Sequence, residues 1–237
     1  MQVRPGSQEE QVGRLILAAV VVTALPNVPV LGYAFYPFAI LVTWFHEMGH
    51  GLTGLLLGFD FHRLVILPDG SGLAQSRGGP AGAVPQALVA AGGPLAPSFV
   101  GGLLILASSR HEWWRPALLA LAAMIALSVV IWVRSATGLV VLPLVAAGLV
   151  WLVMKGRVAW QRPALQFLGV LAALSMFGDW RYLFTETVVV GGQVMLSDTG
   201  QIERALLLPH WFWAVALIAI AGLVVGTSLK FALARDG

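Results

Sequence analysis

The chain has 237 residues, of which 58% are hydrophobic and 11% charged, and its mean hydropathy is +0.85. Soluble domains carry about 25% charged residues, so this composition excludes an ordinary water-soluble domain and predicts a membrane protein. The net charge of +3 comes from basic residues dispersed through the loops, which argues against a nucleic-acid-binding surface. The absence of cysteine excludes disulfides and thiolate metal sites.

Apolar stretches long enough to cross a bilayer recur along the chain. We expect an all-α polytopic membrane protein with six or seven transmembrane helices in a single domain over residues 1–237, located in the cell membrane. The first helix is expected to be retained rather than cleaved as a signal peptide, because Glu9 and Glu10 interrupt its basic flank. The expected spans are 12–31, 33–58, 82–107, 116–133, 138–154, 163–184 and 210–231.

The second predicted span contains the motif "HEMGH". A helix places His46 and His50 on one face, where both can bind one zinc ion at about 2.0–2.1 Å. Glu47 would then take a proton from the zinc-bound water. The alternative is a chance match, or two histidines with a purely structural role. No other charged residue lies between Ala34 and Gly58, and ionisable groups inside a membrane usually serve a function.

The segment that follows, "FHRLVILPDGSGLAQSR" at 61–77, differs in composition from the apolar spans. Leu64 to Leu67 is rich in strand-forming residues, and "PDGSG" is a strong turn signal, so we expect a β-hairpin at the membrane surface. An edge strand of this hairpin could hold an unwound substrate by β-addition.

The third predicted span contains "AAGGPLAPS" at 90–98. Pro94 and Pro97 are expected to bend or interrupt the helix. Irregular backbone at membrane depth is tolerated mainly where it lines protein or a wet cavity, so we expect this discontinuity beside the site.

A catalytic zinc ion usually has three protein ligands and one open position, so a third ligand is needed. Asp179 is the first candidate, because the second and sixth spans should run in the same direction. His50 lies 17 residues past Tyr33 and Asp179 lies 16 past Pro163, which places both about 25 Å from one membrane face. The alternative is that Asp179 ends its helix or pairs with an arginine.

Asp198, in "LSDTGQIE", is the second candidate for the third ligand. Its alternative interpretation is an N-cap, followed by a short amphipathic helix. Glu186 and Glu203 are weaker candidates. Three further histidines lie at predicted span ends and are expected at the membrane interface: His62, His111 and His210.

Three segments resemble the site-2 protease family of intramembrane zinc metalloproteases, in a compact branch that lacks a PDZ domain. They are "FHEMGHGLTGLLLG", the β-prone segment after it, and "AAGGPLAPS", which is similar to the family's "AGPxxN" element. Pro97 and Ser98 stand near the place of the family's asparagine. The family's third-ligand element is matched only in part, by "SMFGDW" and by "LSDTG".

The resemblance implies that His46 and His50 bind one zinc ion and that Glu47 is the catalytic base. It also implies a membrane-protein substrate, cut within a transmembrane segment near the cytosolic side. The leading hypothesis is therefore a zinc-dependent intramembrane endopeptidase. A zinc transporter and a catalytically silent, zinc-binding membrane scaffold are the alternatives. The sequence predicts the lipid bilayer and the substrate as partners, no nucleic acid, and no particular oligomeric state.

Overall fold

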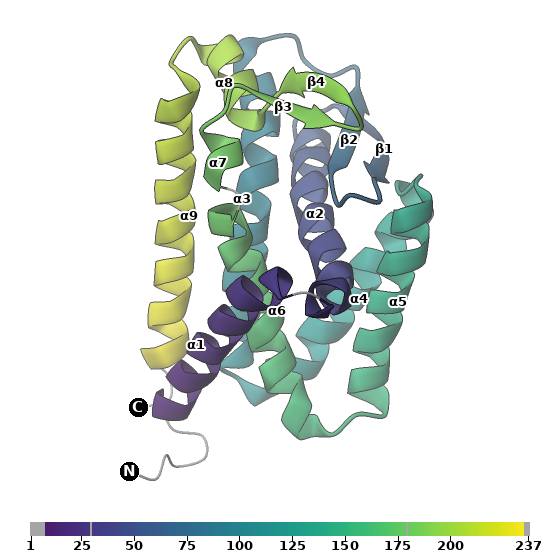
Figure 1. Cartoon of the computed structure of the whole chain (residues 1–237), viewed down its shortest axis with the longest axis vertical. Coiled ribbons are helices and arrows are strands. Elements are labelled where there is room, and N and C mark those ends of the chain that lie inside the picture. Colours follow the sequence, from purple (N-terminus) through teal and green to yellow (C-terminus); the bar gives the residue numbers. More distant parts are fainter. Residues whose placement is uncertain (1–7, 29, 179, 235–237) are drawn as a thin grey trace.

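Long helices form most of the computed structural model, which describes residues 8–28, 30–178 and 180–234 (Figure 1). The helices are α1 Gln8–Ala24, α2 Leu31–Leu56, α3 Ala83–Ser108, α4 His111–Ile131, α5 Ala136–Met154, α6 Gln161–Gly178, α7 Trp180–Leu183, α8 Asp198–Leu206 and α9 His210–Leu233. Two short 3₁₀ turns, η1 Leu25–Asn27 and η2 Val158–Trp160, follow α1 and precede α6. The helix α3 lies at the centre of the bundle, in contact with α2, α6 and α9.

Fewer helices are suited to cross a membrane than the apolar stretches predicted. Within the described residues, α3, α4, α5 and α9 are long and apolar enough, and α1–η1 together with α2 qualifies as one bent pair. The chain therefore has four such helices, or up to five, and the expected six or seven is too high. The all-α membrane fold class is confirmed.

The difference in span number has a physical cause in α2 and α6. The polar "HEMGH" motif lowers the hydropathy of α2, and α6 begins with Gln161 and Arg162 and contains the buried Gln166. The apolar residues of α6 pack inside the bundle, where Leu165 and Leu171 are almost fully buried. The polar residues lower the mean hydropathy of α2 and α6, so neither qualifies as a span by itself.

The predicted hairpin at 61–77 is confirmed. The strands β1 Asp60–Ile66 and β2 Gly72–Arg77 pair antiparallel, with Leu64 opposite Ala74. The hairpin is docked on the α4–α5 turn, because Leu64 N–H donates to the Trp132 carbonyl at 2.8 Å and Arg134 N–H donates to the Leu64 carbonyl at 2.9 Å. The turn of the hairpin is tied to α2, where the Thr43 hydroxyl donates to the Gly70 carbonyl at 2.6 Å.

A second hairpin, which the sequence analysis missed, lies beside α8. The strands β3 Thr187–Val190 and β4 Gln193–Leu196 pair antiparallel through a turn at Gly191 and Gly192. Both glycines have positive φ angles, 57° and 79°, as a two-residue hairpin turn requires. The segment "VVVGGQVML" carried this signal: β-branched residues on either side of a Gly-Gly pair.

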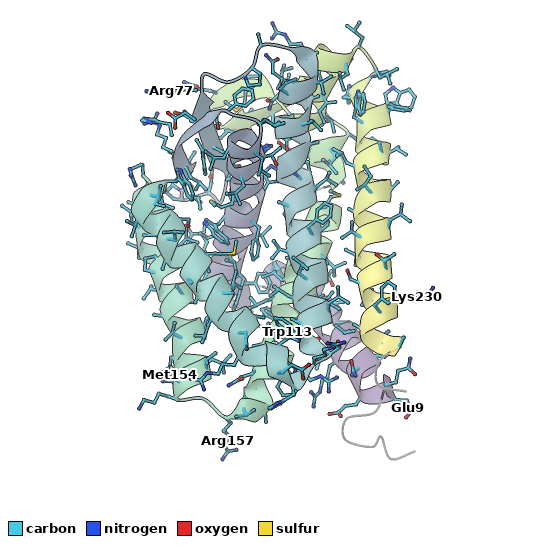
Figure 2. The ribbon with its side chains drawn as sticks, turned by 180° about the vertical axis from the view of Figure 1, so that it is seen from behind. Glu9, Arg77, Trp113, Met154, Arg157 and Lys230 are labelled. Atoms are coloured by element: carbon cyan, nitrogen blue, oxygen red, sulfur yellow. The ribbon has the colours of Figure 1, made fainter. Side chains whose placement is uncertain are left out.

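Both hairpins and α8 lie at the end of the bundle where α2 ends and α3 and α9 begin (Figure 1). Figure 2 shows Arg77 of β2 at this end, and Met154 and Arg157 at the opposite end. We call the first of these the hairpin end. This end carries both hairpins and the short helix α8, so polar groups from distant parts of the sequence meet here.

The prolines of α3 do not interrupt it. The helix runs without a break from Ala83 to Ser108, with Pro94 and Pro97 inside it. Instead, the glycines of the "AAGGP" segment allow α3 to pack closely against α2. A Cβ atom added to Gly49 of α2 would overlap the Gly92 carbonyl of α3, so only glycine permits the observed crossing.

Candidate metal centre

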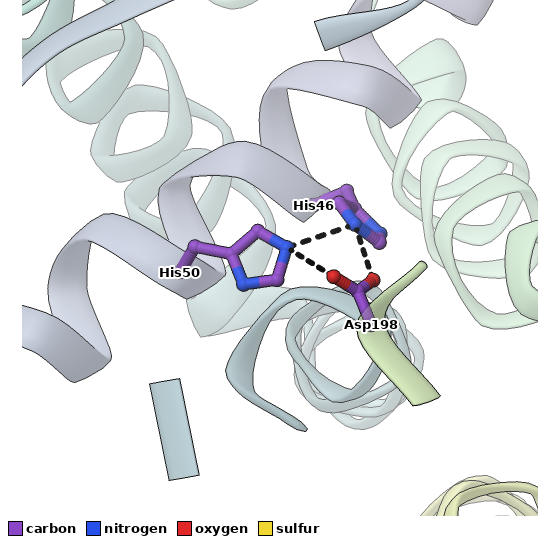
Figure 3. Close-up of side chains that lie close together, drawn as sticks. All are labelled: His46, His50 and Asp198. Carbon is purple, nitrogen blue, oxygen red and sulfur yellow. Dashed lines mark hydrogen bonds and ion pairs between the residues drawn. The ribbon is translucent and has the colours of Figure 1, made fainter. Parts of the chain in front are cut away.

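The two histidines of α2 project from one face of the helix into the bundle (Figure 3). They are one turn apart, and their Nε2 atoms lie 3.1 Å from each other. The rings are steeply inclined, with centroids 4.8 Å apart and an interplanar angle of 76°. Both imidazoles therefore direct the same nitrogen to one point, as the four-residue spacing predicts.

The third member of the cluster is Asp198, the first residue of α8. One carboxylate oxygen, Oδ2, lies 3.1 Å from His46 Nε2, and the other, Oδ1, lies 3.2 Å from His50 Nε2. The residue is almost fully buried, at 2% exposure. Burial by itself raises the pKa of this carboxyl, but the adjacent imidazoles of His50 and His46 outweigh it and hold the pKa below its ordinary value.

Ser197 allows Asp198 to take this position. Its hydroxyl oxygen accepts the Gly200 N–H at 3.0 Å and so caps α8. The alternative interpretation of Asp198 as the N-cap is therefore wrong by one residue. The short helix expected after it is present. Because the serine supplies the cap, the aspartate is free to face α2.

The three side chains fit a single divalent cation. In a tetrahedral zinc site with bonds of about 2.0–2.1 Å, the donor atoms lie about 3.3 Å from one another. The two imidazole nitrogens lie 3.1 Å apart, which is close to that value. Each nitrogen has a different oxygen of the Asp198 carboxylate at 3.1 or 3.2 Å, and one ligand atom from each of the three residues lies within 4.8 Å of the other two. Two imidazole nitrogens and one carboxylate oxygen also form the donor set of catalytic zinc sites that keep a fourth position open. Among the described residues this is the one group of three or more such side chains that can hold a metal ion.

Neighbouring groups orient the cluster. His50 Nδ1–H donates to the Val89 carbonyl of α3 at 2.8 Å, which leaves Nε2 as the metal-facing nitrogen. Any side chain at Gly93 would overlap the His50 imidazole, so α3 can lie this close to His50 only with a glycine at this position.

The Tyr182 hydroxyl of α7 donates to Asp198 Oδ2 at 3.0 Å, and its ring lies edge-on to His46. Sequence reasoning missed Tyr182, whose one signal was a polar hydroxyl at the end of an apolar stretch.

Glu47 faces the hairpin rather than the lipid. It is buried, and its Oε2 accepts the Ala74 N–H of β2 at 2.6 Å. The backbone of β2 passes so close that a Cβ at Gly72 would lie 2.6 Å from Glu47 Cγ. The Ala74 N–H points away from β1, so this side of β2 is a free strand edge directed at the site.

Two cavities meet at the cluster. One, of about 680 Å³, extends towards α8, and the other, of about 400 Å³, extends between α2, α3 and α6. Both are lined by His46, Glu47, Gly72 and Tyr182. A polypeptide that occupies both cavities would therefore pass the cluster and the free edge of β2.

The remaining sequence candidates lie apart from this cluster or outside the described residues. Asp179, the first choice for the third ligand, lies outside the part of the chain that the structure describes. The Glu203 carboxylate accepts the His210 N–H at 2.6 Å, with His210 Nδ1 2.8 Å away, and Glu186 is exposed. His62 is exposed, and His111 packs edge-on against Trp114 near the opposite end of the bundle.

Comparison with protein-family models matches residues 14–228 to a family described as peptidase M50B-like. Comparisons with curated proteins and with solved structures find no match. The matched range includes α2, the first hairpin and α8, and hence the whole cluster of His46, His50 and Asp198. It confirms the resemblance to the site-2 proteases seen in the sequence. The chain belongs to the peptidase M50B-like family.

Proposed function

We propose that this chain is a zinc-dependent intramembrane endopeptidase that hydrolyses peptide bonds of membrane-protein substrates. The observation that carries the proposal is the meeting of two histidines from α2 with a buried aspartate from α8, at distances suited to one zinc ion. The peptidase family match over most of the chain supports the reaction class. Helices suited to cross a membrane support the setting.

In this proposal His46, His50 and Asp198 hold the ion, and Glu47 performs the proton transfers. A bound zinc ion would polarise the scissile carbonyl and lower the pKa of a water molecule. Glu47 takes the proton from that water and delivers it to the departing amine. The Ala74 N–H, 2.6 Å from Oε2, holds the carboxylate beside the cluster.

The hairpin supplies the surface on which a substrate can be held in an extended form. A helical peptide bond is shielded by its own helix, so the substrate must unwind before attack. In the described part of the chain, the edge of β2 that faces Glu47 is paired with no other strand, and β-addition there would present the substrate chain to the cluster. The cavities on either side of the cluster provide room for the flanking residues.

The test separates hydrolysis from metal binding. The purified Glu47→Gln protein, reconstituted in liposomes, should retain its zinc content but lose cleavage of single-span model polypeptides. Glu112→Gln is the matched control, because Glu112 is exposed at the opposite end of the bundle, where it pairs with Arg110 at 3.8 Å. Cleavage that persists in Glu47→Gln would overturn the role of this residue. Zinc uptake into liposomes without cleavage would favour transport instead.

A further inference from the structure

The depth of the metal cluster and Glu47 in the membrane can be inferred from the lengths of α4 and α5. The 21 residues of α4 and the 19 of α5 span about 31 and 28 Å, close to the hydrocarbon thickness of about 30 Å. If α4 and α5 cross the bilayer, as their length and composition indicate, the turn between them, which carries the exposed Arg134, lies at one face of the membrane. The Arg134 guanidinium donates to the last carbonyls of α4, including Ile131 O at 2.7 Å.

Two hydrogen bonds and one pair of opposite strand residues connect that turn to Glu47. The Trp132 carbonyl accepts the Leu64 N–H of β1, Leu64 lies opposite Ala74 of β2, and the Ala74 N–H donates to Glu47. Each step crosses from one strand or helix to its direct neighbour. Glu47 therefore lies at the membrane boundary marked by the α4–α5 turn, not at the centre of the bilayer.

The two cavities that meet at this level differ in chemistry. The cavity towards α8, here called the polar cavity, includes Ser76, Gln86, Gln201 and Arg204. The cavity between α2, α3 and α6, here called the apolar cavity, has polar residues at the hairpin turn and the cluster, and hydrophobic residues along its helical walls: Val42, Pro94, Pro97, Met176 and Leu183. A chain that extends through both passes from an apolar to a polar environment.

Arg204 is the one charged residue of the polar cavity outside the metal cluster and Glu47. It is exposed on α8, and it forms no ion pair with any residue in the described part of the chain. The adjacent carboxylate, Glu203, is bonded to His210 and does not neutralise it. Among the described residues that line the apolar cavity, none is a lysine or an arginine. Its charged wall residue outside the site is Asp69, whose carboxylate accepts the Ser71 N–H and hydroxyl within the hairpin turn.

We propose that the cleft binds a polypeptide where it leaves the bilayer, with hydrophobic residues in the apolar cavity and an acidic side chain paired with Arg204 in the polar cavity. This inference rests on the proposed endopeptidase function and names its substrate class: a transmembrane segment with an acidic juxtamembrane flank. The unpaired guanidinium supplies the charge complementarity, and the depth of Glu47 places the scissile bond at the boundary.

The test uses binding, so that it does not depend on hydrolysis. Three synthetic peptides share an apolar segment of about 20 leucines and alanines. They carry Glu, Gln or Lys flanks at both ends, with a glycine beside each flank. Affinity is measured in nanodiscs for zinc-loaded Glu47→Gln protein. The Glu peptide should bind about 1.5- to fivefold more tightly than the Lys peptide, the range for an exposed ion pair, and the preference should weaken at high salt.

The charge reversal Arg204→Glu, in the same background, should invert this preference towards the Lys peptide. Arg157→Glu is the matched control, because it changes the net charge equally but lies at the opposite end of the bundle (Figure 2). Equal affinity for the three peptides, or an Arg157→Glu effect as large as that of Arg204→Glu, would overturn the inference.

Cleavage of the same peptides by the wild-type protein separates this inference from the proposed function. Cleavage without any flank preference would leave the endopeptidase standing and refute the role of Arg204. Charge-selective binding without cleavage would support the binding site and count against hydrolysis. Cuts mapped by mass spectrometry should fall at the end of the apolar segment, and cuts near its centre would contradict the boundary position.

Discussion

Asp198 lies with its two carboxylate oxygens 3.1 and 3.2 Å from the Nε2 atoms of His46 and His50, respectively. This contact joins α2 to α8 across about 150 residues of sequence, and it is possible because Ser197 takes over the capping of α8. The cluster thus combines a local motif with one residue delivered by tertiary structure. The orientation of the Asp198 side chain towards α2 therefore depends on the cap that Ser197 supplies.

Asp198→Asn should lower zinc affinity by at least a hundredfold, because a neutral amide is a poor substitute for a carboxylate ligand. Asp179→Asn, which changes the candidate favoured by helix arithmetic, should leave the affinity within about twofold. Competition with a chromogenic chelator measures both. The reverse pattern, with zinc lost in Asp179→Asn and kept in Asp198→Asn, would show that the cluster is not the metal site.

Tyr182→Phe should reduce zinc affinity about tenfold, since groups that orient metal ligands typically contribute ten- to hundredfold. The substitution removes only the hydroxyl that donates to Asp198 at 3.0 Å and keeps the ring beside His46. Tyr36→Phe is the control, because that hydroxyl donates to the Pro68 carbonyl of the hairpin turn. Calorimetric titration should find the Tyr36 variant unchanged. Equal losses in both variants would point to a general effect on folding.

Gly93→Ala should displace His50, because the new methyl group would overlap its imidazole. We expect a loss of zinc affinity and a destabilisation of about 1–3 kcal/mol, the usual cost of overpacking. Gly222→Ala on α9 has nothing within 4 Å and should be neutral or slightly stabilising. Thermal denaturation with and without zinc measures the two effects. A Gly93→Ala protein with wild-type zinc affinity would mean that α3 does not press on His50.

The Glu203–His210 contact should make the start of α9 and the end of α8 sensitive to acid. The pKa of Glu203 is lowered, first by the His210 main-chain N–H and then by its side chain. Because the folded pKa lies below the unfolded one, the contact stabilises the fold above the ordinary carboxyl pKa. That contribution is lost as the pH falls through the folded pKa.

Hydrogen-exchange protection of α8, corrected for intrinsic rates, tests this pH dependence. Protection should fall in acid for the wild type and become less dependent on pH in Glu203→Gln, which cannot ionise. Glu112→Gln, at the opposite end of the bundle, should keep the wild-type profile. An unchanged profile in Glu203→Gln would rule out this contact as the source.

The spacing of residues along the sequence was enough to predict the shared face of the two histidines and the first hairpin. The four-residue interval between His46 and His50 puts both on one face of any helix, and the "PDGSG" turn brings β1 and β2 together wherever the hairpin lies. Composition determined that the fold is helical and suited to a membrane. The β3–β4 hairpin was also readable, from its Gly-Gly turn.

Only the tertiary structure decided which residues join the motif. Helix arithmetic predicted Asp179 at the depth of His50, and that residue lies outside the described part of the chain. Depth along a helix does not say which side of the helix faces the site. Asp198 and Tyr182 reach the cluster through loops, whose path no periodicity encodes. The structure also set the bounds of each helix. With those bounds, the polar residues of α6 leave it below the hydropathy of a membrane span, so fewer spans qualify than the sequence predicted.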